Sequence, residues 1–182
     1  MRSDEDLARG VQQGDADDLQ ALVARHHGRL FGFLFRMAGG DRQLAEDLTQ
    51  ETFVRMLRGM AQYRYPRPFK PWLYAIGVNL ARDTFKGAAW RRTEALTEAM
   101  PLPETGRLAP ERVLLRREAA RAVETAVGAL PAHQRAAVLL RYREGMSLAE
   151  VAAVLDVPVG TVKSRLSLAL RALRAALEEE EV

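Results

Sequence analysis

A stretch rich in proline divides this chain into two halves that both have a helical pattern. Residues 93–112 contain three prolines, one glycine, few large apolar side chains and no sustained helical period. On either side, apolar residues recur at steps of three and four, and no alternating, strand-like pattern is present. We therefore expect an all-α protein with two small helical domains, residues 1–92 and 113–182, joined by a flexible linker at 93–112.

Composition excludes several classes of protein. The 182 residues include no cysteine and three histidines, which argues against disulfide scaffolds, zinc fingers and iron–sulfur clusters. No apolar run approaches the ~20 residues that span a bilayer, and the N-terminus is acidic where a signal peptide is basic. We expect a cytoplasmic protein without a cofactor, a bound metal or membrane insertion.

Enzyme motifs are also missing from the sequence. It contains no P-loop, dinucleotide-binding fingerprint or metal-ligand spacing. His26 and His27 are neighbours on a predicted helix and therefore point in different directions. We predict that the protein is not an enzyme.

The C-terminal half contains the pattern of a helix-turn-helix. Ser147 and Glu150 form a capping box, and residues 156–158 supply a short turn before a second helix. One stripe of that second helix is made of Leu166, Leu170, Leu173 and Leu177, so its opposite face is the candidate DNA-binding surface. This face carries Gly160, Thr161, Ser164, Leu168 and Arg171, with Lys163 and Arg165 on its flanks. The alternative is an amphipathic hairpin whose basic face only meets solvent.

Aromatic and basic residues are concentrated in the N-terminal half. Residues 63–90 hold seven of the twelve aromatic residues, and residues 55–92 hold nine basic residues against one acidic residue. Aromatic rings can stack on unpaired bases while cations neutralise the phosphate backbone. This combination indicates a surface that opens duplex DNA.

The helix that follows Pro71 sharpens this interpretation. Its spacing predicts one exposed side, made of Trp72, Ala75, Asn79, Arg82 and Lys86. Asn79 alone offers both an amide donor and an acceptor there, as recognition of an extruded base edge requires. The alternative is that Trp72 and Tyr74 fill the core and that Asn79 is solvated.

An earlier helix has an unusual acidic face. Its spacing predicts a core face made of Ala45, Leu48, Thr49, Thr52, Phe53 and Met56. A second face carries Asp47, Gln50, Glu51 and Val54. This face is either ordinary solvated surface or a docking site for another protein.

In this order, these motifs resemble those of the extracytoplasmic function (group 4) sigma factors of bacterial RNA polymerase, in the sigma-70 family. AEDLTQETFVRML is similar to the polymerase-docking helix, and YRYPRPFKPWLYAIGVNLARD to the promoter-melting segment. LPAHQRAAVLLRYREGMSLAEVAAVLDVPVGTVKSRL is similar to the domain that recognises the upstream element. The resemblance covers nearly the whole chain.

The resemblance implies a sigma factor that binds core RNA polymerase, recognises the −35 and −10 promoter elements and traps melted DNA. Asp47, Gln50, Glu51 and Phe53 would contact the clamp helices of the polymerase, and Arg64, Arg67 and Lys70 lie in the loop expected to set downstream-element preference. Trp72 and Asn79 would act at the downstream element, with Arg82 and Lys86 beside them. Arg141, Lys163, Ser164 and Arg165 would bind the upstream element, next to Thr161 and Arg171.

One departure and two further expectations accompany the resemblance. Ser167 and Leu168 stand where the family usually has an aromatic residue or histidine and then arginine, so two DNA contacts are replaced. Members of the class are commonly held by an anti-sigma factor, which we expect as a partner. The competing hypothesis is a stand-alone repressor or activator, but the N-terminal half lacks the strands of a receiver domain.

Overall fold

The computed structural model describes residues 2–85 and 110–179, and within these ranges the protein is helical without strands. Its elements are α1 (Asp4–Gln12), α2 (Ala16–Met37), α3 (Arg42–Gly59), the 3-10 helix η1 (Met60–Gln62), α4 (Phe69–Thr84), α6 (Pro110–Ala129), α7 (Ala132–Val138), the π-helix η2 (Leu139–Arg143), α8 (Leu148–Leu155) and α9 (Val159–Glu179). The predicted linker lies outside the described residues, except for its last three residues, which begin α6. No described helix is long and apolar enough to cross a bilayer.

Helices α1 to α4 form the N-terminal unit. Ser3, Asp15 and Asp41 cap α1, α2 and α3, because each side chain accepts a hydrogen bond from a backbone amide of the first turn. Phe33 and Met56 are completely buried between the helices. Helix α1 was not among the expected elements, although its cap and acidic first turn are signals of a helix start.

Helices α6 to α9 form the C-terminal unit and confirm the helix-turn-helix. Ser147 and Glu150 make both hydrogen bonds of the capping box, and α8 ends at Asp156 in the left-handed conformation (φ 53°). Helix α9 runs for 21 residues. The prediction that its leucine stripe is buried is only partly correct. Leu170 is 42% exposed, because the buried stripe runs through Val162, Leu166 and Ala169 and so lies on a neighbouring face of the helix.

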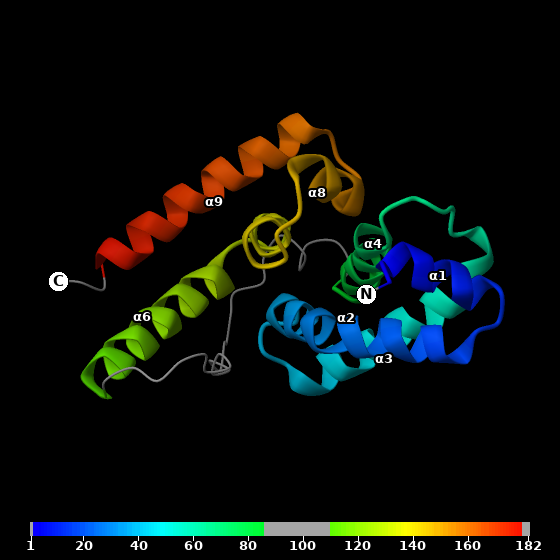
Figure 1. Ribbon diagram of the computed structural model, residues 1–182. Helices are drawn as coiled ribbons and strands as arrows, with labels where there is room; N and C mark the ends of the chain where they lie inside the picture. The colour runs from blue at the N-terminus through cyan, green and yellow to red at the C-terminus, as the bar shows by residue number, and fades with distance from the viewer. Residues whose placement is uncertain (1, 86–109, 180–182) are drawn as a thin grey trace.

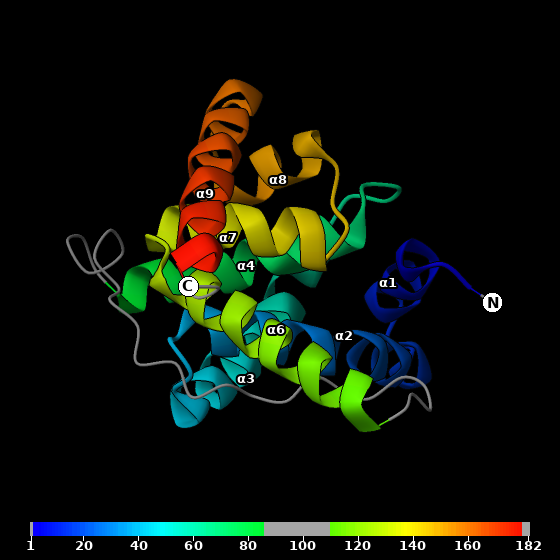
Figure 2. The same cartoon turned by 90° about the vertical axis from the view of Figure 1, so that its left-hand side faces the viewer.

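The two units pack directly against each other, with α4 against α8 and α2 against α7 (Figures 1 and 2). Arg135 of α7 is completely buried and donates to the carbonyl oxygen of Arg36 in α2 at 3.0 Å. Arg36 in turn forms an ion pair with Glu124 of α6. Charged groups therefore bridge the two units, and burial lowers the pKa of Arg135 to about 10.

Candidate nucleic-acid and partner interfaces

The acidic face of α3 is exposed, as the spacing predicts. Asp47 and Gln50 are exposed, and Glu51 forms an ion pair with Arg55 one turn later at 2.8 Å. Val54 and Leu57 extend this face with apolar side chains that are 38% and 43% exposed. Leu57 was missed, although it lies one turn beyond Val54. A surface that mixes carboxylates with exposed aliphatic side chains is suited to a protein partner.

Phe53 does not belong to this exposed face. It is half-buried, and its ring stacks on His27 of α2 with centroids 6.1 Å apart and planes 12° from parallel. The α3 residues expected in the core are buried apart from Phe53. Phe53 thus links the α2–α3 packing to the surface beside Asp47 and Gln50.

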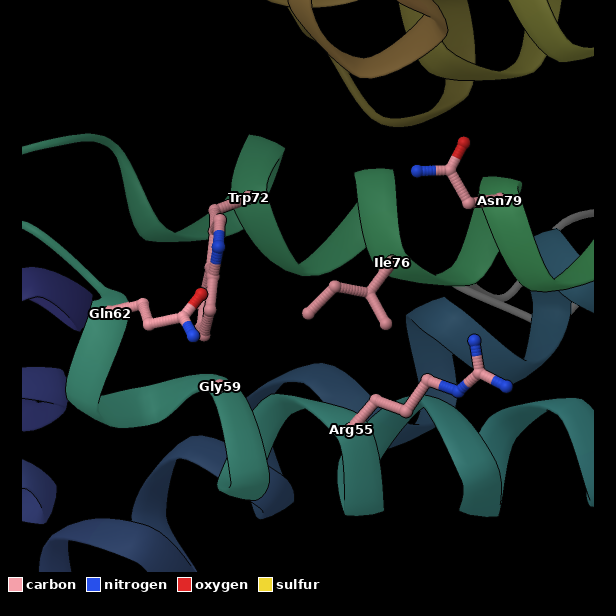
Figure 3. A pocket seen from close by; sticks show the side chains of 6 residues that line it. All are labelled: Arg55, Gly59, Gln62, Trp72, Ile76 and Asn79. Carbon is pink, nitrogen blue, oxygen red and sulfur yellow. The ribbon is translucent and has the colours of Figure 1, made fainter.

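A cavity of about 280 Å³ opens between α3 and α4. It is lined by Arg55, Gly59, Gln62, Trp72, Ile76 and Asn79. Figure 3 shows Trp72 and Ile76 pointing from α4 toward α3, with the Gln62 amide beside the indole. The Asn79 amide points away from α3 at the rim, and the side chain is exposed. The cavity thus combines an aromatic wall, an apolar floor, the Gln62 amide and a cation, with the Asn79 amide at its rim.

Trp72 satisfies both alternatives left open by the sequence. Its indole packs against the rings of Tyr63 and Phe69, with centroids 5.1 and 5.8 Å away, yet it also forms a wall of the cavity. Tyr74, by contrast, is completely buried and has no free face for a ligand. Trp72 and Tyr74 therefore have different roles although they lie two residues apart.

Helix α1 anchors the loop that precedes α4. The Gln12 amide donates to the carbonyl oxygens of Met60 and Tyr63 at 2.9 and 2.7 Å, and a Glu5 carboxylate oxygen accepts from the Phe69 amide at 3.0 Å. Tyr63 is buried beneath the loop, and its hydroxyl donates to the Arg67 carbonyl oxygen; burial raises the pKa of Tyr63 to about 12.

The basic residues of this loop are fixed to different degrees. Arg64 and Arg67 are exposed, whereas Lys70 is largely buried and pairs with Glu144 of the C-terminal unit at 3.1 Å. Arg82 donates to the carbonyl oxygen of Leu155 at 3.1 Å. Lys86 lies outside the described residues. Sequence reasoning missed these contacts because they join residues more than 70 positions apart.

The candidate DNA-binding face of α9 is open at its start. Lys163, Ser164 and Arg171 are exposed, and Thr161 and Arg165 are half-buried. The Ser164 hydroxyl donates to the Thr161 carbonyl oxygen at 3.0 Å, one turn earlier in the helix. Ser167 and Leu168 are exposed on the next turn.

Arg141 is held in place by its own unit. Its guanidinium donates to the Met146 carbonyl oxygen at 2.7 Å. Arg165 lies near a cation of the other unit: burial, and then repulsion from Arg82, lowers the pKa of Arg165.

Comparison with known protein families identifies both units. Residues 22–91 match the model of sigma-70 region 2, and residues 120–173 match sigma-70 region 4. The RNA polymerase sigma-H factor of Pseudomonas aeruginosa is 32% identical over 98% of this chain and 95% of its own length. The ECF RNA polymerase sigma-E factor of Haemophilus influenzae is 33% identical over 90% of this chain and 89% of its own length.

Solved structures agree with these matches. CnrH, solved in complex with the cytosolic domain of CnrY, aligns with a TM-score of 0.70 and 28% identity over 97% of each chain. The sigma factor RpoE of Bartonella quintana, solved with the anti-sigma factor NepR, has the same fold, with a TM-score of 0.68 and 23% identity over 90% of this chain and 98% of its own.

The chain therefore belongs to the sigma-70 family, in its extracytoplasmic function (ECF) branch. It is a promoter-recognising sigma factor, which binds core RNA polymerase and directs transcription initiation without catalysing a reaction itself. The stand-alone repressor or activator is set aside, because both region 2 and region 4 are present.

Proposed function

We propose that this protein is a dissociable group 4 sigma factor whose N-terminal unit captures an unpaired base of the melted downstream element. The observation that carries this proposal is the cavity between α3 and α4, which lies in the most basic part of the chain. Its volume is at the low end of pockets that hold small ligands. Stacking on Trp72 would contribute about 1–3 kcal/mol for one base.

The polar groups of the cavity would have different roles in binding the nucleotide. The Asn79 amide, exposed at the rim, would recognise the edge of the extruded base, because it can both donate and accept. Arg55 and Gln62 would bind the same nucleotide from the α3 side, and neither was among the residues expected from sequence. Arg64 and Arg67 would contact phosphates beside the cavity.

The start of α9 would bind the upstream element. Lys163 and Arg171 are exposed cations suited to phosphate contacts, while the small residues Gly160 and Ser164 let the backbone approach DNA closely. Arg141 and Arg165 would add contacts from the flanks, and Thr161 would line the first turn. Because Ser167 and Leu168 replace two family contacts, we expect the upstream sequence preference to differ from the family pattern.

The acidic face of α3 would dock on core polymerase through Asp47, Gln50 and Glu51, with Phe53 supporting them. Since the acidic residues meet solvent, Asp47→Arg with Glu51→Lys should change the free energy of unfolding by only about 0.5 kcal/mol while weakening polymerase binding. Competition against the unmodified protein for core polymerase measures this effect. Glu178→Lys, an exposed charge reversal on α9, is the matched control.

The proposal as a whole is tested by adding the purified protein to core polymerase and measuring promoter-dependent initiation. If the docking double variant folds normally and still competes fully for polymerase, these residues do not form the interface. If the unmodified protein supports no initiation at any promoter of its source genome, the assignment of the two DNA surfaces is wrong.

The relatives support a further partner and a compartment. RpoE was solved with an anti-sigma factor, and CnrH with the cytosolic domain of CnrY. We infer that an anti-sigma factor also binds this protein, and that the protein acts in the cytoplasm, where polymerase and promoters are found.

A further inference from the structure

Glu144 lies at the centre of the contact between the two units. It follows the π-helix η2, and its side chain is only 2% exposed. The Tyr74 hydroxyl donates to Glu144 Oε2 at 2.7 Å, and Lys70 Nζ lies 3.1 Å from the same oxygen. Lys70 also donates to the Glu144 carbonyl oxygen at 2.6 Å. Both partners of this buried carboxylate come from α4 in the other unit.

The backbone around Glu144 explains how the side chain reaches α4. The Glu144 amide donates to the Leu139 carbonyl oxygen, the wide spacing of a π-turn, and Gly145 then turns the chain with a φ of 70°. A buried carboxylate without a cation is strongly unfavourable. Glu144 is therefore stable in this position only while Lys70 remains beside it.

A second contact joins the two units at the C-terminal end of α4. Arg82 of α4 donates to the Leu155 carbonyl oxygen at the C-terminus of α8, where the helix dipole favours a cation. Arg165 of α9 is close enough to Arg82 for repulsion to act on it. The α4 surface therefore faces α8, and the C-terminal unit lies beyond the Asn79 side of α4 (Figure 3).

We propose that Glu144 competes with DNA phosphate for Lys70 and holds the free protein in a closed form that cannot bind melted promoter DNA. This inference rests on the proposed function of α4 as the downstream-element surface. A phosphate oxygen and a carboxylate oxygen attract the same ammonium group, so Lys70 cannot pair fully with Glu144 and with a DNA phosphate at the same time. Opening the two units frees Lys70 and uncovers α4.

Both attraction and repulsion between charged groups act across the contact of the closed form. Arg143 lies near Arg36, and burial followed by this repulsion lowers the pKa of Arg143. Arg82 and Arg165 form a second pair of like charges across the contact. The ion pairs of Glu144 with Lys70 and of Glu124 with Arg36 offset this repulsion. Loss of one carboxylate should therefore shift the equilibrium from the closed form to the open form.

The test uses the full-length variant Glu144→Gln, which keeps the shape of the side chain and removes its charge. Small-angle X-ray scattering reports the radius of gyration, and fluorescence anisotropy with a short single-stranded DNA of random sequence reports binding. We expect a larger radius of gyration and about tenfold tighter DNA binding, as for the loss of one charge-assisted hydrogen bond from the closed form. Glu46→Gln is the control, because it removes the charge of an ion pair within α3.

Tyr74→Phe provides an independent variant from the other unit. It keeps the buried ring and removes the hydroxyl that donates to Glu144. It should shift both measurements in the same direction by a smaller factor. If either variant is folded and retains the unmodified radius of gyration, Glu144 does not hold the closed form and the inference is wrong.

The two proposals fail in distinguishable ways. If Glu144→Gln expands the protein without tightening DNA binding, the competition for Lys70 is refuted, even though the units are held by Glu144. If Glu144→Gln leaves the radius of gyration unchanged while the unmodified protein binds single-stranded DNA and supports initiation, only the closed form is refuted and the proposed function stands.

Discussion

The two basic surfaces of this protein differ in how far their side chains are already engaged in the fold. On α4, Lys70 and Arg82 bind groups of the C-terminal unit, and Trp72 is packed against two aromatic rings. On α9, Lys163 and Arg171 are exposed. A basic segment found in sequence can therefore form either an open surface or a surface that must first be uncovered.

The largest effect should come from Trp72, where folding and binding overlap. Trp72→Ala should lower the free energy of unfolding by about 2–3 kcal/mol, because a half-buried indole is lost from an aromatic cluster. Trp72→Phe should recover most of this stability while still weakening binding to single-stranded DNA. Chemical denaturation and anisotropy separate the two losses. Equal recovery of stability and binding in the phenylalanine variant would assign Trp72 to the core alone.

Asn79 should show the opposite behaviour, since its side chain is exposed. Asn79→Ala should leave stability within about 0.5 kcal/mol and lose roughly 1–3 kcal/mol of discrimination at one downstream base. Initiation assays on intact and pre-opened promoter templates, each with all four bases at that position, measure the loss. Complete rescue by pre-opening, with base preference intact, would show that Asn79 serves melting and not base recognition.

Alanine substitution of Lys70 and of Lys163 provides a direct comparison of the two surfaces. Lys70→Ala removes the cation beside the buried Glu144 and, because Lys70 is itself 23% exposed, should lower stability by about 2 kcal/mol, as for the loss of a hydrogen bond to a charged group. Lys163→Ala should leave stability unchanged and lower the salt dependence of duplex binding by about one ion. Thermal denaturation and salt titrations provide the comparison. Equal stability of the two variants would remove the distinction between an engaged and an open surface.

The last effect is absent near neutral pH and concerns the tyrosines beneath the α4 surface. Burial raises the pKa of Tyr63 to about 12 and raises that of Tyr74 further. Above the unfolded pKa near 10, the unfolded tyrosines lose protons that the folded ones keep, so stability must fall as pH rises. We expect a loss of roughly 1 kcal/mol per pH unit from each group between pH 10 and 12. Denaturation of Tyr63→Phe over this range should show a shallower decline; an unchanged decline would contradict the buried, protonated Tyr63.

Much of the fold could be predicted because its signals are local. The capping box at Ser147 and Glu150 is complete within four residues, and the helical period identifies the buried residues of α3. The prediction that Leu170 is buried is wrong. The smaller Ala169 packs in the core instead, and a stripe chosen from leucines alone leaves it out. The exposure of Asp47 and Asn79 was predictable for the same reason that the helices were.

The candidate site was predictable only in part. Trp72 and Asn79 share one side of α4, which spacing alone can place. Arg55 and Gln62 come from the preceding helix and turn, and their approach depends on how α3 packs against α4. No periodicity within one helix specifies the angle at which a second helix crosses it.

Local signals in the sequence are enough to predict which segments are helical, where two of them form a helix-turn-helix, and which helix faces carry aromatic rings, amides and cations. These properties depend on residues within one or two turns of each other. Three features depend instead on how the helices pack: the ion pair of Lys70 with Glu144, the contact of Arg82 with the end of α8, and the cavity beside Trp72. Such contacts arise when distant helices bury their faces together, and packing and desolvation then select which charges pair.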